Sequence, residues 1–175
     1  MEHGIEVFQP KSMKDGEALE ILKKIEPQLI VVVAFGKILP KEILDLPPYG
    51  CINVHGSLLP KYRGDAPIQW SVLNGDKITG ITTMDMDGGL DTGDMLLKSR
   101  TEIGPEETSG ELHDRLSKMG AELIVETLKE VEAGTVRRTP QGDAETSYAS
   151  MLTKELGKID WGRPAGELHN LVRGL

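Results

Sequence analysis

Two polar side chains at the end of a predicted strand are the first candidates for chemistry. Asn53 and His55 stand two positions apart in the segment Cys51 to His55, and side chains two apart in a strand share one face. An amide N–H and an imidazole N–H on one face would donate together to the developing oxyanion of acyl transfer. The alternative is a buried Asn and a core His that each bond to loop backbone, which is the commoner role of an isolated Asn-x-His pair.

A third candidate is the carboxylate of Asp91, which lies in the glycine-rich segment Asp87 to Gly93. A carboxylate near His55 would favour the charged imidazolium and make it a better acid. The neighbouring residues offer no nucleophile with an evident base, because Cys51 lies two residues deeper on the same strand face and Ser57 has no base partner. The set therefore favours direct transfer over a covalent intermediate.

Several other chemistries find no support in the sequence. It contains no GxGxxG dinucleotide pattern, no Walker A loop, no HExxH zinc motif and no Gly-x-Ser-x-Gly elbow. The aspartates between Asp85 and Asp94 resemble a calcium-binding loop, but Gly89 occupies the fifth position, where that loop needs a ligand. We therefore expect no metal site.

The elements that must position these residues alternate along the chain. Longer strands are predicted over Leu29–Phe35, Cys51–His55, Ile78–Met86 and Met95–Thr101, and shorter ones near Ile5–Phe8, Thr135–Pro140 and Tyr148–Ala149. Helices are predicted over about Lys14–Ile25 with Ser12 as cap, Lys41–Leu46, Ala66–Leu73, Thr108–Ala133 and Pro164–Val172. This alternation is typical of an α/β domain with a largely parallel, twisted sheet, in which ligands bind at the carboxyl ends of the strands.

Two of these elements are predicted in more detail. The run Leu29–Phe35 is apolar without alternation, which indicates a strand buried on both faces of a sheet. Thr108 and Glu111 form a capping-box pattern at the start of the longest helix, and Gly134 ends that helix.

Composition limits the class of protein. A chain of 175 residues suits one domain, and its longest apolar run is far shorter than the roughly 20 residues of a membrane span. The N-terminus lacks a signal-peptide pattern, and a single cysteine, Cys51, excludes an internal disulfide. We expect a cytoplasmic protein with no membrane partner. The net charge of −8 argues against strong nucleic-acid binding by this chain alone.

Six stretches together carry a family resemblance. They are Gly4–Pro10, Val31–Pro40, Gly50–Gly64, Ala66–Gln69, Met84–Leu96 and Ile159–Trp161. The combination of Asn-x-His-x-Ser-Leu-Leu-Pro with Asp-Thr-Gly-Asp is specific. The chain resembles the catalytic domain of the tetrahydrofolate-dependent formyltransferases, in particular those that act on methionyl-tRNA.

The resemblance implies roles for individual residues. It identifies Asn53, His55 and Asp91 as the catalytic residues. It places the formyl donor, 10-formyltetrahydrofolate, against Phe35, Gly36, Ile38, Leu39, Ser57, Leu58, Leu59, Pro60, Gly88, Gly89 and Leu90. It implies no metal. For the apolar members of this set, plain core packing is an equally common role.

The resemblance also implies an acceptor and an architecture. The acceptor is the amino group of methionyl initiator tRNA, which attacks the formyl group directly through an oxyanion intermediate. The implied fold is Rossmann-like with a mostly parallel twisted sheet. The family's N-terminal strands, its basic tRNA-binding loop and its C-terminal barrel domain have no counterpart here, so residues 1–175 are expected to be a partial catalytic domain. Unpaired strands in such a chain predict self-association.

Two other functions stay open from the sequence. The same site would serve another acceptor, such as glycinamide ribonucleotide, an amino sugar or water, although the purine-pathway relatives typically have Pro where this chain has Gly56. Alternatively, the chain is a non-catalytic folate-binding fragment.

Overall fold

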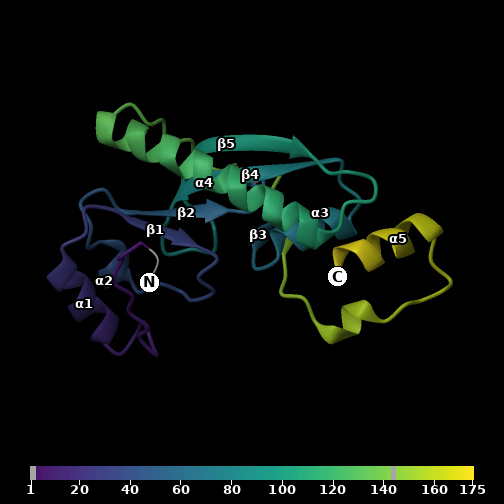
Figure 1. The fold of residues 1–175 in the computed structure, drawn as a ribbon, viewed down its shortest axis with the longest axis horizontal. Helices are drawn as coiled ribbons and strands as arrows, with labels where there is room; N and C mark the ends of the chain where they lie inside the picture. The colour runs from purple at the N-terminus through teal and green to yellow at the C-terminus, as the bar shows by residue number, and fades with distance from the viewer. Residues whose placement is uncertain (1–2, 143–144) are drawn as a thin grey trace.

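A computed structural model describes residues 3–142 and 145–175 of the chain. Its main sheet has four strands in the order β1-β2-β4-β5 (Figure 1). These strands are β1 (Ile30–Val33), β2 (Cys51–His55), β4 (Ile78–Asp85) and β5 (Met95–Glu102). A second, two-stranded sheet pairs β3 (Arg63–Gly64) with β6 (Tyr148–Ala149) in parallel.

The α/β fold class is confirmed, but the sheet is mixed rather than mostly parallel. β1 and β2 run parallel, whereas β2 with β4 and β4 with β5 are antiparallel. The loop of residues 86–94 joins β4 to β5 without a helix to carry the chain back. A connection of that kind reverses the chain and gives an antiparallel pair.

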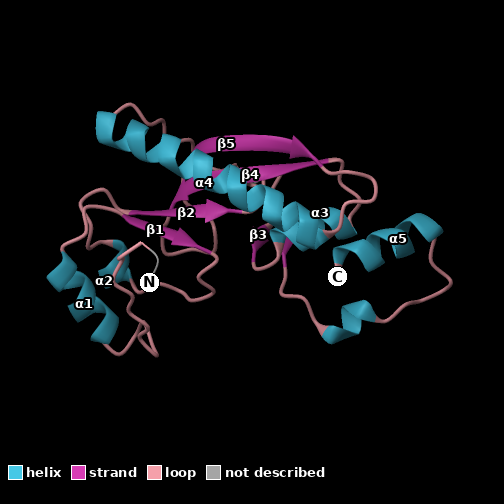
Figure 2. Cartoon of the chain, viewed as in Figure 1, coloured by secondary structure: helices cyan, strands magenta, loops and turns pink. Residues whose placement is uncertain are grey.

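The helices that accompany this sheet differ greatly in length (Figure 2). They are α1 (Glu17–Ile25), α2 (Lys41–Leu44), α3 (Pro67–Leu73), α4 (Ser109–Ala133), α5 (Ala165–Gly174) and a short 3₁₀ helix, η1 (Lys154–Gly157). The long α4 contacts β4 and β5, and α5 contacts α3. None of the helices in the described part of the chain is long and apolar enough to cross a bilayer.

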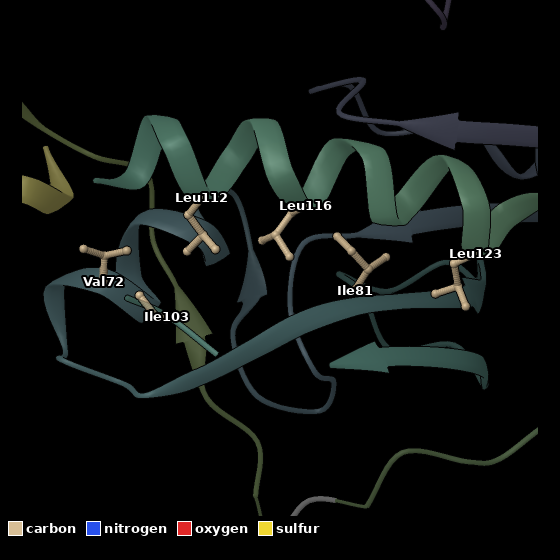
Figure 3. Close-up of a cluster of buried hydrophobic side chains, with 6 residues drawn as sticks. All are labelled: Val72, Ile81, Ile103, Leu112, Leu116 and Leu123. Carbon is tan, nitrogen blue, oxygen red and sulfur yellow. The ribbon is translucent and has the colours of Figure 1, made fainter. Parts of the chain in front are cut away.

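The largest buried cluster lies between α4 and β4. Its members are Val72, Ile81, Ile103, Leu112, Leu116 and Leu123. Figure 3 shows Leu112 and Leu116 pointing from α4 toward the sheet, with Leu112 near Val72 and Ile103 and Leu116 near Ile81. The predicted capping box is present, since the Thr108 hydroxyl accepts from Glu111 N at 3.3 Å and Glu111 Oε2 accepts from Thr108 N at 2.9 Å. Gly134 ends the helix in the left-handed conformation.

The prediction for α1 was wrong at its start. Ser12 does not cap the helix, because its hydroxyl accepts from Lys14 N, and the helix begins three residues beyond Lys14, at Glu17. The Asp15 carboxylate accepts from Glu17 N at 3.1 Å, and Gly16 turns the chain with φ 87°. A local side-chain bond at Ser12 therefore replaces the first helical turn.

Two predicted strands near the N-terminus also differ. Residues 5–8 form no strand, and Ile5, Val7 and Phe8 are exposed. β1 is shorter than predicted and buries only one face: Ile30 and Val32 pack against the cluster of Ala18, Leu39 and Ile43, while Val33 is 60% exposed. The reason is position, because β1 lies at an edge of the described sheet. In the tail, the predicted strand 135–140 is reduced to a single bridge between Thr139 and Met95.

Candidate active site

The three predicted catalytic residues lie together at the carboxyl end of β2. Asn53 Nδ2 is 3.4 Å from Asp91 Oδ1, and His55 Nδ1 is 3.6 Å from Asp91 Oδ2. The strand register explains why Asp91 lies beside Asn53 and His55, because Asp85, the last residue of β4, pairs with Ile52 of β2. The loop that follows β4 therefore starts beside β2 and returns Asp91 to the face that Asn53 and His55 share.

A backbone carbonyl fixes the tautomer of His55. Its Nε2 lies 2.8 Å from the carbonyl oxygen of Tyr62. A carbonyl only accepts, so Nε2 carries a proton and Nδ1 is the nitrogen that faces Asp91. His55 is 5% exposed, which shields this bond from water.

Tyr62 is itself held firmly, although neither its residue type nor its position in the sequence indicated a role in the site. Its backbone is left-handed, with φ 61°. Its phenol donates to Asp76 Oδ2 and accepts from Asn74 Nδ2, both at 2.8 Å. Burial, with the Asp76 carboxylate as a further cause, raises the pKa of the Tyr62 phenol. The contacts of Tyr62 thus keep its carbonyl in place over His55.

Asp91 is anchored by groups from two other segments. Its backbone is left-handed, with φ 52°. Its Oδ2 accepts from Gly64 N at 2.8 Å, and its carbonyl accepts from Gln141 Nε2 at 2.8 Å. Neither partner carried a signal in the sequence, because both contacts involve backbone groups far away along the chain.

The Ser57–Pro60 segment contributes buried side chains to the fold. Ser57 donates to the carbonyl of Lys61 at 2.6 Å, and Leu59 packs with Met84 and Met95. Ser57 and Leu59 are each 1% exposed. Contact between these two side chains and a ligand therefore remains a prediction, and the structure gives each of them a packing role.

Backbone bonds tie the same segment to the sheet. Leu59 N donates to Thr82 Oγ1, Thr82 Oγ1 donates to the carbonyl of Ser57, and Lys98 Nζ donates to the carbonyl of Leu59. Burial lowers the pKa of Lys98. Leu58 and Leu59 also line a cavity of about 310 Å³ together with Lys98, Arg100 and Glu145.

The remaining predicted folate residues divide by exposure. Phe35, Ile38 and Leu90 are exposed, and Ile38 reaches 78%. Gly36, Gly88 and Gly89 are exposed as well. Leu39 is buried in the cluster with Ala18 and Ile43. The exposed members stay available to a ligand, whereas Leu39 packs inside the domain.

Two further features limit the chemistry of the site. Burial raises the pKa of the Cys51 thiol to about 11, so the thiolate that a cysteine nucleophile needs is scarce at neutral pH. The described residues contain no group of three or more His, Cys, Asp or Glu side chains arranged to hold a metal.

The fold and the site define a class of protein. Residues 2–128 match the family model described as formyl transferase, and the chain therefore belongs to the formyl transferase family. Among curated relatives, the methionyl-tRNA formyltransferase of Agathobacter rectalis is 58% identical over 175 residues, covering 100% of this chain and 56% of the relative. That of Acetivibrio thermocellus is 55% identical over 174 residues, covering 99% and 56%. The chain thus spans about half the length of these relatives.

Solved structures agree on the fold. A 4-N formyltransferase from Francisella tularensis superposes with a TM-score of 0.80 at 23% identity, covering 94% of this chain and 66% of that one. An N-formyltransferase from Helicobacter canadensis, in complex with folinic acid and dTDP-3-aminofucose, gives a TM-score of 0.66 at 27% identity, covering 70% and 46%. The Rossmann-like formyltransferase fold is confirmed.

Proposed function

We propose that this chain transfers a formyl group from 10-formyltetrahydrofolate to the amino group of methionyl initiator tRNA. The observation that carries the proposal is the cluster of Asn53, His55 and Asp91 at the end of β2. The 58% and 55% identical relatives named methionyl-tRNA formyltransferase support this acceptor.

The reaction follows from the donors in the cluster. The neutral amine attacks the formyl carbon, and a tetrahedral oxyanion forms. Asn53 has a second N–H on Nδ2 for that oxygen, and the imidazole of His55 supplies a further N–H donor. Asp91 Oδ2 lies 3.6 Å from Nδ1 of His55. Collapse of the intermediate breaks the bond to N10 of the folate. The amine loses one proton and N10 gains one, a transfer that Asp91 assists through water.

We propose that the donor binds beside this cluster. The exposed residues Phe35, Gly36 and Ile38 supply one wall, and the loop Gly88–Leu90 supplies another. Leu39, Ser57, Leu58, Leu59 and Pro60 complete the site, in which the buried Leu39, Ser57 and Leu59 support the wall from inside the domain. The folinic acid bound in the Helicobacter canadensis relative supports a folate ligand.

We further propose that residues 1–175 form the catalytic domain and that affinity for tRNA comes from other segments. The net charge of −8 supports this division, because it repels phosphate. A tRNA acceptor also places the reaction in the cytoplasm, in agreement with a single free, buried cysteine.

The direct test is a formylation assay on the complete gene product. It is incubated with 10-formyltetrahydrofolate and methionyl initiator tRNA, and formyl-methionyl-tRNA is measured. We expect product with the wild type and almost none with His55→Ala. A folded protein that binds the folate but forms no formyl-methionyl-tRNA would contradict the proposal.

A second acceptor has support from one observation. The Helicobacter canadensis structure contains a nucleotide-linked amino sugar together with its folate. The same assay with dTDP-3-aminofucose in place of tRNA separates the two functions. Product from the sugar alone would favour a sugar formyltransferase.

A further inference from the structure

Gln141 makes three hydrogen bonds that use its whole side-chain amide. Nε2 donates to the carbonyl of Asp91 at 2.8 Å and to the carbonyl of Gly93 at 2.7 Å. Oε1 accepts from Arg63 Nε at 2.9 Å. The orientation of the amide is unambiguous, because the reversed amide would set its oxygen against two carbonyl oxygens and its N–H groups against a guanidinium.

The loop to which Gln141 binds contains two backbone positions of restricted conformation, Asp91 and Gly93. Asp91 is left-handed, a conformation that is uncommon for a residue with a Cβ. Gly93 is packed so closely that a Cβ there would lie 1.9 Å from the carbonyl oxygen of Asp85. Such a loop keeps its shape only when its surroundings determine it.

Both residues of β3 help to hold Asp91, one directly and one through Gln141. Gly64 N donates to the Asp91 carboxylate, while the neighbouring Arg63, which is 5% exposed, orients Gln141. The side chain of Asp91 is therefore held directly and its backbone is held through Gln141.

The distances from Asp91 to Asn53 and His55 are long, so the position of the Asp91 loop matters for both contacts. Asp91 Oδ1 lies 3.4 Å from Asn53 Nδ2, at the outer limit of hydrogen bonding, and Asp91 Oδ2 lies 3.6 Å from His55 Nδ1, within the distance of an ion pair but beyond that of a hydrogen bond. A small displacement of the loop would remove both contacts. We infer that Gln141 is a positioning residue, which holds Asp91 within reach of Asn53 and His55. This inference rests on the proposed function.

The variant Gln141→Met tests the inference, because it keeps a side chain of similar length and removes all three hydrogen bonds. A displaced catalytic group of this kind lowers kcat by up to about a hundred-fold. We expect that fall in the complete gene product, with little change in KM for the folate. Gln28→Met is the matched control, since Gln28 is exposed and its side chain makes no hydrogen bond within the described residues. It should keep wild-type kinetics.

Combination with Asp91→Asn separates positioning from general structure. If Gln141 acts through Asp91, the double variant should be no slower than Asp91→Asn alone. Losses that multiply, or an unchanged kcat in Gln141→Met, would overturn the inference. If Gln141→Met does not fold, Gln141→Asn, which retains the amide but is too short for all three bonds, carries the same expectations.

Amide hydrogen exchange in the loop of residues 87–93 distinguishes this inference from the proposed function. Gln141→Met should speed exchange there and leave α4 protected, whatever the site catalyses. Faster loop exchange in a protein with no formyl transfer would reject the function and retain the positioning role. Unchanged loop exchange would reject the positioning role.

Discussion

At the scale of single residues, Asn53 is the group whose loss should be most specific to catalysis. Asn53→Ala removes the proposed oxyanion donor, and the loss of one such donor typically costs about 10²–10³ in kcat. KM for the folate should change little, because the oxyanion forms only during the reaction. Steady-state kinetics on the complete gene product would check this. Turnover near that of the wild type would remove Asn53 from the mechanism.

Asp91→Asn should disable the enzyme and preserve its fold. The Asn side-chain oxygen can still accept from Gly64 N, the bond that anchors the carboxylate at 2.8 Å. The charge that faces His55 is lost, however. We expect strongly reduced formyl transfer with a cooperative melting transition close to that of the wild type. Loss of the melting transition would show that the residue is needed for folding.

The residues of the site differ in how well the sequence predicts them. Asn53 and His55 are predictable because a strand repeats every two residues and they are polar among apolar neighbours. Tyr62 and Gln141 are not, because Tyr62 acts through its own backbone carbonyl and Gln141 binds backbone carbonyls of the loop, and no residue type specifies a carbonyl group. Tyr62 also resembles an ordinary turn residue, and the bond from His55 that gives it a role forms only in the folded chain.

At the scale of elements, α4 should contribute most to stability through its buried face. Leu112 is fully buried between α4 and the sheet, whereas Val125 on the same helix is 50% exposed. Leu112→Ala should lower the free energy of unfolding by about 2–5 kcal/mol, and Val125→Ala by less than about 0.5 kcal/mol. Chemical denaturation of both variants measures the difference. Equal effects would mean that this cluster does not dominate the core.

The same helix shows why some elements can be predicted and others cannot. The capping box at Thr108 and the glycine at 134 are local signals, and α4 begins and ends where they indicate. The exposure of β1 depends instead on which strands lie beside it, which the run Leu29–Phe35 does not encode. The direction of β4 depends on the path of the chain through α3, and the alternating pattern of β4 is the same in either direction.

At the scale of the whole molecule, the edge strand β1 predicts self-association of the 175-residue chain. Its outer edge is unpaired within the described residues, and Val31 and Val33 are 39% and 60% exposed. Exposed apolar edges of this kind pair with other chains.

Val33→Lys should reduce the apparent mass of the chain in light scattering, since a charge on an edge strand opposes pairing. Val172→Lys, at a 70% exposed position on α5, is the matched control and should not alter the mass. A wild-type chain that is a monodisperse monomer would contradict the expectation.

β3 pairs with β6, which lies more than 80 residues further along the chain, so this part of the site forms late in the synthesis of the protein. The contacts among β4, β5 and α4 lie within residues 78–133, so they can form while the chain is still growing. The groups that finish the site come later: Gln141 reaches back 50 residues to Asp91, and Ser147 reaches back 85 to Tyr62. Contacts so distant along the chain form slowly compared with local ones. A nascent chain released before residue 141 would hold a packed helix on a sheet, but its loop of residues 87–93 would lack one of the two anchors that hold Asp91.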